Sequence, residues 1–174
     1  MRLNKLPWGV GLKKNLPVMD TERHFPKDAI ILSTTDLKGS ITYINPDFVD
    51  VSGFTEDELI GKNHNIIRHP DMPPGAFADL WSHLKDQKPW MGIVKNRVKN
   101  GDYYWVDAFV MPICEQGTVK EYQSVRMRPE PAHRERAEAL YKRLMEGKPV
   151  RRSLSGRLGL AGKLVAVSPV SDSA

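Results

Sequence analysis

Three side chains that could hold a polar ligand fall within four positions, at Arg68, His69 and Asp71. Pro70 interrupts them, which disfavours a regular helix and stiffens a turn. An arginine can donate two parallel hydrogen bonds to a pyrophosphate. The histidine can donate to a phosphate or a ring carbonyl, and the aspartate can accept from ribose hydroxyls or hold the arginine. A solvated turn with a local Arg–Asp pair is the alternative, and the residues alone leave both open.

A second group of candidate binding residues lies on a strand that we expect over residues 90–98. Because side chains alternate along a strand, Trp90, Gly92 and Asn96 share one face. An indole can stack on a flat heterocycle, the glycine leaves room for one, and an amide both donates and accepts hydrogen bonds. Alternatively, Trp90 is a core residue at a strand start and Asn96 faces solvent.

Residue patterns typical of enzymes and metal sites are weak. The single cysteine, Cys114, excludes an intrachain disulfide, and we expect it to be a buried or partly buried, inert thiol. His64 and His69 are five positions apart without a third suitable ligand nearby, so no zinc site is expected. No Ser–His–Asp or Cys–His arrangement has a context that favours catalysis. We therefore expect a protein that is not an enzyme, with no catalytic residues.

Length and composition favour one folded domain with extensions. The chain has 174 residues, of which 40% are hydrophobic and 27% charged, which supports a packed core. No apolar run approaches the ~20 residues of a membrane helix. The N-terminus, residues 1–5, lacks the apolar segment of a signal peptide. A cytoplasmic protein is the expectation.

The net charge of +5 is unevenly distributed. Residues 1–119 carry 14 Lys and Arg against 15 Asp and Glu, whereas residues 120–163 carry 12 against 5. Nucleic-acid-binding proteins more often carry their positive charge on the folded face, so we expect no nucleic-acid partner. A basic segment after a neutral domain is typical of a linker or of a segment near an anionic membrane surface. A solvated charged helix is the alternative.

Local signals predict two strands, several short helices, three further strands and a last helix. The strands are expected at residues 30–35, 41–44, 90–98, 103–114 and 118–127. The helices are expected at 46–52 after an Asn45 cap, at 55–60 from a Thr55–Glu58 capping box, from Pro73-Pro74 onward, and at 132–145. This order predicts an α+β fold with a five-stranded antiparallel sheet and short helices on one face.

Four segments are expected along the chain. An N-terminal arm over residues 1–28 has no sustained period, and order is expected to begin near Ala29. The folded domain spans residues 29–128, and a C-terminal helix lies within 129–146. Residues 147–174 are basic and rich in Gly and Ser, which predicts a linker.

Several segments of the folded region resemble the PAS family. Residues 35–45 are similar to its opening hairpin, 51–61 to its first pair of helices, and 99–105 to the turn before its long strand. Residues 64–73 and 90–97 resemble, more specifically, the PAS domain of aerotaxis receptors. The resemblance implies the PAS fold, an FAD cofactor and redox sensing. It also implies a HAMP and chemoreceptor signalling region as partner, in cis or in trans.

The resemblance assigns the FAD-binding roles to residues at matching positions. The expected cofactor-binding residues are Arg68, His69, Asp71, Trp90, Asn96, Asn45, Phe77 and Trp81. Asn45 could instead be only a helix cap, and Phe77 and Trp81 could be core residues. We also expect a homodimer and, if the chain is part of a full-length receptor, a place at the cytoplasmic face of the inner membrane.

Three other functions stay open at this point. The main alternative is a haem-binding gas sensor of the same fold, with His64, His69 or His83 as the axial ligand. A flavoenzyme would need an acid–base pair beside the ring, and the sequence offers no clear pair. A ligand-free interaction module would fill its pocket with side chains. Light-driven flavin–cysteine adduct chemistry is not expected, because residues 64–69 contain no cysteine.

Overall fold

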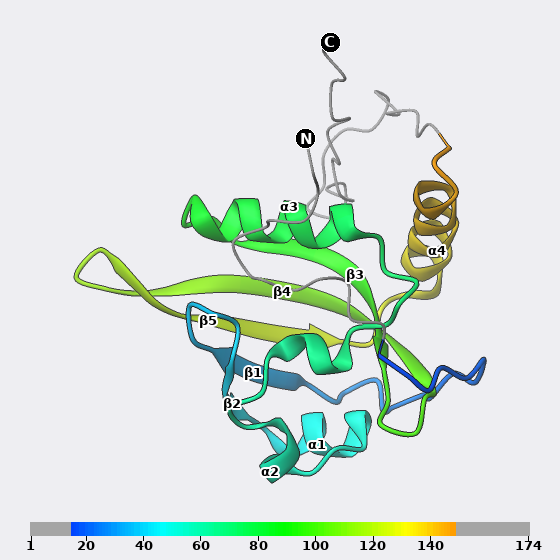
Figure 1. Cartoon of the computed structure of the whole chain (residues 1–174), viewed down its shortest axis with the longest axis horizontal. Coiled ribbons are helices and arrows are strands. Elements are labelled where there is room, and N and C mark those ends of the chain that lie inside the picture. The colour runs from blue at the N-terminus through cyan, green and yellow to red at the C-terminus, as the bar shows by residue number, and fades with distance from the viewer. Residues whose placement is uncertain (1–14, 149–174) are drawn as a thin grey trace.

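The computed structural model of the chain describes residues 15–148 (Figure 1). In chain order its elements are β1 (Ile31–Thr35), β2 (Ile41–Ile44), α1 (Pro46–Ser52), α2 (Glu56–Leu59), the 3-10 helix η1 (His64–Ile67), α3 (Pro74–Lys85), β3 (Trp90–Arg97), β4 (Tyr103–Glu115), β5 (Thr118–Met127) and α4 (Pro131–Met145). The predicted order of strands and helices is confirmed. No helix within the described residues is long and apolar enough to cross a membrane.

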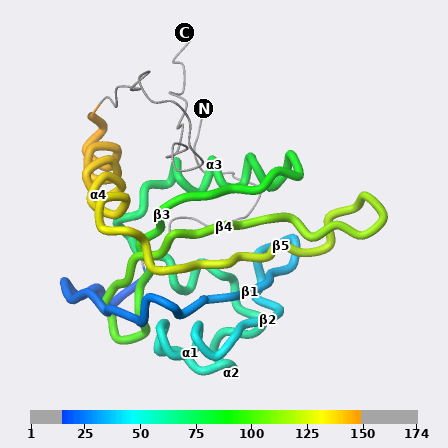
Figure 2. The backbone as a smooth tube through the Cα atoms, turned by 180° about the vertical axis from the view of Figure 1, so that it is seen from behind, coloured from blue at the N-terminus to red at the C-terminus, as the bar shows by residue number. Residues whose placement is uncertain are grey.

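The five strands form one antiparallel sheet in the order β2-β1-β5-β4-β3. Pairing of β1 with β5 joins the first hairpin to the three-stranded meander. Figure 2 shows the strands in this order, with α3 on the β3 side and α1 and α2 on the β2 side. The predicted α+β fold with a five-stranded antiparallel sheet is therefore confirmed.

Helix caps fix the short helices where the sequence predicts them. The Asn45 side chain accepts from the Phe48 amide, and α1 ends at Gly53, whose φ of 71° favours glycine. Thr55 and Glu58 form the predicted capping box at α2. These local contacts satisfy helix-end amides without help from distant residues.

The helices α1, η1 and α3 cover one face of the sheet, called here the inner face. Gly92, Ala108 and Arg126 lie in one row across β3, β4 and β5 on this face. The Arg126 guanidinium lies 5.3 Å from the ring centroid of Phe48 in α1. In α3, Trp81 packs edge-on against a tyrosine of β5. Much of the buried core lies between these helices and the inner face.

Helix α4 packs on the opposite, outer face. Trp105 alternates with Tyr104 along β4 and therefore points away from the inner face. The ring of Tyr141 in α4 stacks on Trp105 at 6.4 Å between centroids, and its hydroxyl donates to the Ile93 carbonyl of β3 at 2.6 Å. The C-terminal helix is thus fastened to the strand that carries two candidate binding residues on its other side.

Two expectations differ from the structure. Order does not begin near Ala29, because Tyr103 exchanges backbone hydrogen bonds with Thr21 and Arg23, which extends pairing into the N-terminal segment. Cys114 is exposed rather than buried, because it lies near the tip of the long β4–β5 hairpin, which extends away from the core. Most of the predicted linker, from residue 149 onward, and residues 1–14 lie outside the described residues.

Candidate ligand-binding site

A group of buried polar side chains occupies the inner face of the sheet. Asn96 of β3 pairs in register with Tyr104 of β4, while Ser124 and Arg126 lie on β5. Asn96 Nδ2, the Tyr104 hydroxyl, Ser124 Oγ and Arg126 Nη1 are buried without a hydrogen-bond partner among the described residues. Buried polar atoms are normally hydrogen-bonded. Four such atoms on one face indicate a place for a ligand rich in oxygen and nitrogen atoms.

Arg126 is the strongest electrostatic feature of this face. Its Nη2 lies 2.6 Å from His64 Nε2 and donates to Ser33 Oγ at 3.0 Å. The side chain is 4% exposed, and the described residues offer it no carboxylate partner within ion-pair distance. Burial lowers the pKa of Arg126 to about 10, so it stays charged at neutral pH. Burial, and then the charge of Arg126, lower the pKa of His64 well below 6.5, so His64 is a neutral acceptor.

No motif in the sequence predicts the contact between Arg126 and His64. The signal in the sequence is weak but present, because Arg126 alternates with Tyr122 and Ser124 and so shares their buried face. A charged residue at an inward position of a central strand is rare unless it has a partner or a ligand. Its contact with His64 joins residues 62 positions apart, which only the fold brings together.

Trp90 and Asn96 lie on the inner face as predicted, with Gly92 between them. The expected space above Gly92 is filled by Trp90 itself, since a Cβ at Gly92 would lie 2.5 Å from the Trp90 indole. The indole nitrogen donates to Asp79 of α3 at 2.8 Å. Trp81 of the same helix packs at 5.7 Å against the Tyr122 ring. The two tryptophans therefore lie where α3 meets the inner face. The indole of Trp90 covers Gly92, where the sequence predicts room for a flat ligand.

Arg68 lies at the edge of this site, against α3. Its backbone bridges to Asn96 of β3, so the turn extends the sheet beyond its edge strand. Its guanidinium carbon lies 4.2 Å from the ring centroid of Phe77, and Nη2 donates to the Met72 carbonyl. Asn15 fastens the turn from outside by donating to the Arg68 carbonyl at 3.0 Å. The structure thus brings Arg68, Phe77 and Asn96 together.

His69 and Asp71 point instead toward the outer face. The His69 ring meets Tyr103 edge-on at 6.0 Å, and it is 1% exposed. Asp71 is largely exposed and binds Lys95 at 2.8 Å. The Lys95 ammonium lies 4.2 Å from the Tyr103 ring centroid. Pro70 therefore separates Arg68, which packs against α3, from the two residues near Lys95. The side chains of Arg68, His69 and Asp71 do not converge on one point.

The buried His69 predicts a loss of stability in acid. Burial and then the charge of Lys95 lower its pKa from 6.5 to about 4, against the opposing effect of Asp71. The unfolded chain therefore binds more protons than the folded chain between these values, and stability falls as the pH drops through this window. Between pH 7 and pH 4.5 the free energy of unfolding of the unmodified protein should fall by roughly 2 kcal/mol more than that of the His69→Gln variant. Urea titrations at both pH values measure the difference.

The exposed His24 supplies the control, because His24→Gln should leave the acid loss unchanged. An equal loss in the His69→Gln variant and in the unmodified protein would contradict the assignment of a neutral, buried His69.

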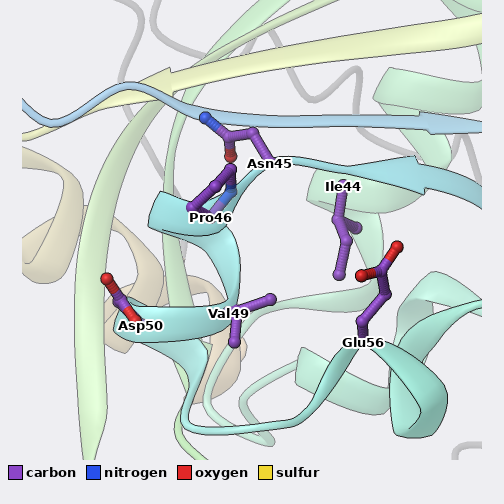
Figure 3. Close-up of a pocket in the computed structure, with 6 residues that line it drawn as sticks. All are labelled: Ile44, Asn45, Pro46, Val49, Asp50 and Glu56. Carbon is purple, nitrogen blue, oxygen red and sulfur yellow. The ribbon is translucent and has the colours of Figure 1, made fainter.

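Asn45 has a structural role that uses its whole amide group. Its oxygen accepts from the Leu32 and Phe48 amides, and its nitrogen donates to the Ile30 carbonyl at 2.6 Å. Next to it lies an open surface pocket of about 290 Å³, lined by Ile44, Asn45, Pro46, Val49, Asp50 and Glu56 (Figure 3). The pocket adjoins β2, α1 and α2, away from the strand that carries Trp90 and Asn96. A ligand role for Asn45 stays a prediction, while its predicted cap is observed.

The polar groups of the inner face are suited to bind a ligand. The described residues contain no group of three side chains suited to hold a metal ion. Burial raises the pKa of Tyr104, so its phenol is neutral. A fixed cation, a neutral phenol, an amide and a hydroxyl can hydrogen-bond a polar heterocycle.

Comparisons with known proteins agree with the fold and the motifs. A family model described as the PAS fold matches residues 41–126. The chain is 46% identical over 155 residues to the aerotaxis receptor of Escherichia coli K12, covering 87% of this chain and 29% of that receptor. It is 28% identical over 95 residues to a nitrogen fixation regulatory protein of Klebsiella pneumoniae, covering 54% of this chain and 19% of that protein. The chain thus spans less than a third of the length of these relatives.

Solved structures are similar at the level of the fold. The light-state structure of the blue-light photoreceptor Aureochrome1 LOV has a TM-score of 0.57 and 18% identity, covering 67% of this chain and 91% of that one. The PAS domain of a protein from Colwellia psychrerythraea has a TM-score of 0.53 and 21% identity, covering 57% of this chain and 86% of that one. At these identities the likeness establishes the architecture only.

Proposed function

We propose that the chain binds FAD and reports cellular redox state or oxygen to a chemotaxis-type output module. The chain belongs to the PAS family and has a sensory domain of the aerotaxis-receptor type. The PAS fold and the similarity to a receptor group this chain with sensory domains, not with enzymes. The output module is proposed to lie in the HAMP and chemoreceptor part of a receptor, in cis or in trans.

The observation that carries the proposal is the group of unpartnered polar atoms on the inner face. Asn96, Tyr104, Ser124 and Arg126 offer donors and acceptors that the protein itself does not satisfy. An uncompensated buried guanidinium is costly unless a ligand supplies acceptors for it. A flavin ring carries carbonyl oxygens and ring nitrogens along one edge, which suits this set of groups.

The other residues have proposed roles around that centre. Trp90 supplies an aromatic surface at the inner face, and Phe77 with Trp81 contributes apolar contacts from α3. Arg68, whose guanidinium lies at the edge of the site, is proposed to bind the phosphates of the cofactor. His69 and Asp71 are proposed to hold the turn through Lys95, which keeps Arg68 in position. A bound flavin supplies reversible electron transfer.

The signal is proposed to leave through β3 and α4. Asn96 lies on the inner side of β3, and Ile93 on the same strand accepts the Tyr141 hydroxyl of α4 on the outer side. A change in the hydrogen bonds of Asn96 can therefore bias how α4 packs, provided that two packings differ in ligand affinity. We further propose a homodimer, a cytoplasmic location beside the inner membrane, and membrane proximity of the basic C-terminal segment.

One absorption spectrum of the purified protein tests the cofactor. Oxidised flavin and haem absorb in different bands, and an intense Soret band marks haem. Denaturation followed by chromatography of the released pigment then separates FAD from FMN. A flavin spectrum with released FAD is the expected result. A Soret band would favour the haem alternative, with the buried and unpartnered His69 Nε2 as the candidate ligand, and a colourless protein reconstituted by neither cofactor would refute both.

A further inference from the structure

A second pocket lies at the end of β3, two positions along the chain from Asn96, where three segments meet. It has a volume of about 450 Å³ and is lined by Arg23, Gly53, Val98, Lys99 and Asn100. These residues come from the N-terminal segment, the end of α1 and the β3–β4 turn. A backbone hydrogen bond from the Lys99 amide to the Ser52 carbonyl, 2.9 Å long, joins two of these segments.

Gly53 lies in close contact with other residues of this pocket. Its φ of 71° is one that L side chains rarely adopt. A Cβ at this position would lie 3.2 Å from Val98 Cγ1 and 3.6 Å from Arg23 Nη1. The side chains of Arg23 and Val98 therefore pack against the main chain of Gly53, which holds the Arg23 guanidinium at the wall of the pocket.

Positive charge around the pocket exceeds negative charge. Lys99 is matched, because its ammonium lies 2.6 Å from Glu58 Oε1. Arg23 and Arg97 form no ion pair with any of the described residues. Asp102 accepts from the side chain of Asn100 at 2.8 Å, so one further carboxylate lies beside the pocket, against two guanidinium groups.

Arg97 is the buried member of this pair. It is 6% exposed, and its Nη1 donates to the carbonyls of Val98 and Lys99, which form the wall of the pocket. Its Nε has no partner. Burial lowers the pKa of Arg97, because the charged form loses solvation.

We propose that this pocket binds an oxyanion of the phosphate or diphosphate class. Arg23 contacts the anion, since a guanidinium presents paired donors to such groups. Arg97 supplies charge from behind the wall, where the lower dielectric strengthens its effect. The ligand is a free phosphate compound, because the phosphates of the cofactor are proposed to lie at Arg68.

The test is a titration of the purified protein with inorganic pyrophosphate at constant ionic strength, followed by amide NMR. Saturable shifts are expected at Gly53, Lys99 and Asn100. The Arg23→Ala variant should bind about tenfold more weakly or worse, because it loses a charge-assisted contact. The Arg136→Ala variant, which removes an exposed arginine of α4, should bind normally.

Arg97→Met removes the buried charge and should also weaken binding of pyrophosphate. If that variant does not fold, the Arg23→Ala variant decides, because Arg23 is exposed. Bound flavin should be retained as the shifts saturate, and release of flavin would mean that the anion competes with the cofactor, which would overturn a separate site. The absence of saturable shifts, or unchanged affinity in Arg23→Ala, would overturn the proposal. Neither outcome depends on the flavin spectrum.

Discussion

Replacing Arg126 with methionine should remove flavin from the purified protein while leaving the flavin-free domain as stable as before or more stable. The guanidinium has an unpartnered Nη1 and no carboxylate partner among the described residues. Losing a charged donor to the ligand corresponds to roughly 10- to 100-fold weaker binding. Methionine fills a similar volume without a charge, so the cost of burying an uncompensated cation is removed, which offsets the loss of the hydrogen bonds to His64 and Ser33.

Two measurements separate these effects. Flavin content is read from the ratio of visible to protein absorbance, and the melting temperature is measured on protein stripped of flavin. The matched control is Arg128→Met, two positions along the chain, where the arginine is exposed. Normal flavin content in Arg126→Met would remove Arg126 from the site. A large drop in the stability of the stripped protein would show that Arg126 is a structural residue rather than one reserved for a ligand.

Local signals account for the parts of the fold that the sequence predicts well. Asn45 caps α1 because its side chain reaches an amide three residues along the chain, and Thr55 and Glu58 pair over the same interval. Trp90 and Asn96 share a face because a strand alternates with a period of two. Each inference needs only a few neighbouring residues, so it does not depend on the rest of the fold.

Contacts between distant segments account for the parts that the sequence does not predict. The pair of His64 and Arg126 forms only after β5 lies beside β1, and no local pattern specifies that pairing. The motif of Arg68, His69 and Asp71 looks like one cluster in sequence. In three dimensions Lys95 draws Asp71 to the outer face, while Arg68 packs on α3.

The N-terminal segment shows the same limit. Thr21 and Arg23 belong to a stretch with no sustained period, and they are ordered by hydrogen bonds to Tyr103. A backbone that pairs with a strand edge needs no pattern of side chains to do so. Composition therefore predicts an arm here, although the structure adds part of it to the sheet.

The second large effect is expected at Tyr141, which fastens α4 to the sheet. Its side chain is 3% exposed, stacks on Trp105 and donates to the Ile93 carbonyl at 2.6 Å. Tyr141→Ala removes the ring and the hydrogen bond together, and large-to-small changes of buried aromatic residues cost about 3–5 kcal/mol. Tyr141→Phe keeps the ring and should cost only about 1 kcal/mol. We expect α4 to open locally in the alanine variant while the sheet stays folded.

Hydrogen exchange measures this directly. Amides of α4 (Pro131–Met145) should lose protection in Tyr141→Ala, whereas amides of β4 and β5 should keep it. The control is Tyr43→Ala on β2, which removes a tyrosine that is 48% exposed. Loss of protection across the whole domain would mean that α4 and the sheet unfold as one unit, which contradicts a separable helix. Because Tyr141 joins α4 to β3, whose other face carries Asn96, α4 protection should also differ between oxidised and reduced protein. Equal protection of α4 in the two redox states would exclude β3 as the route from the ligand to the helix.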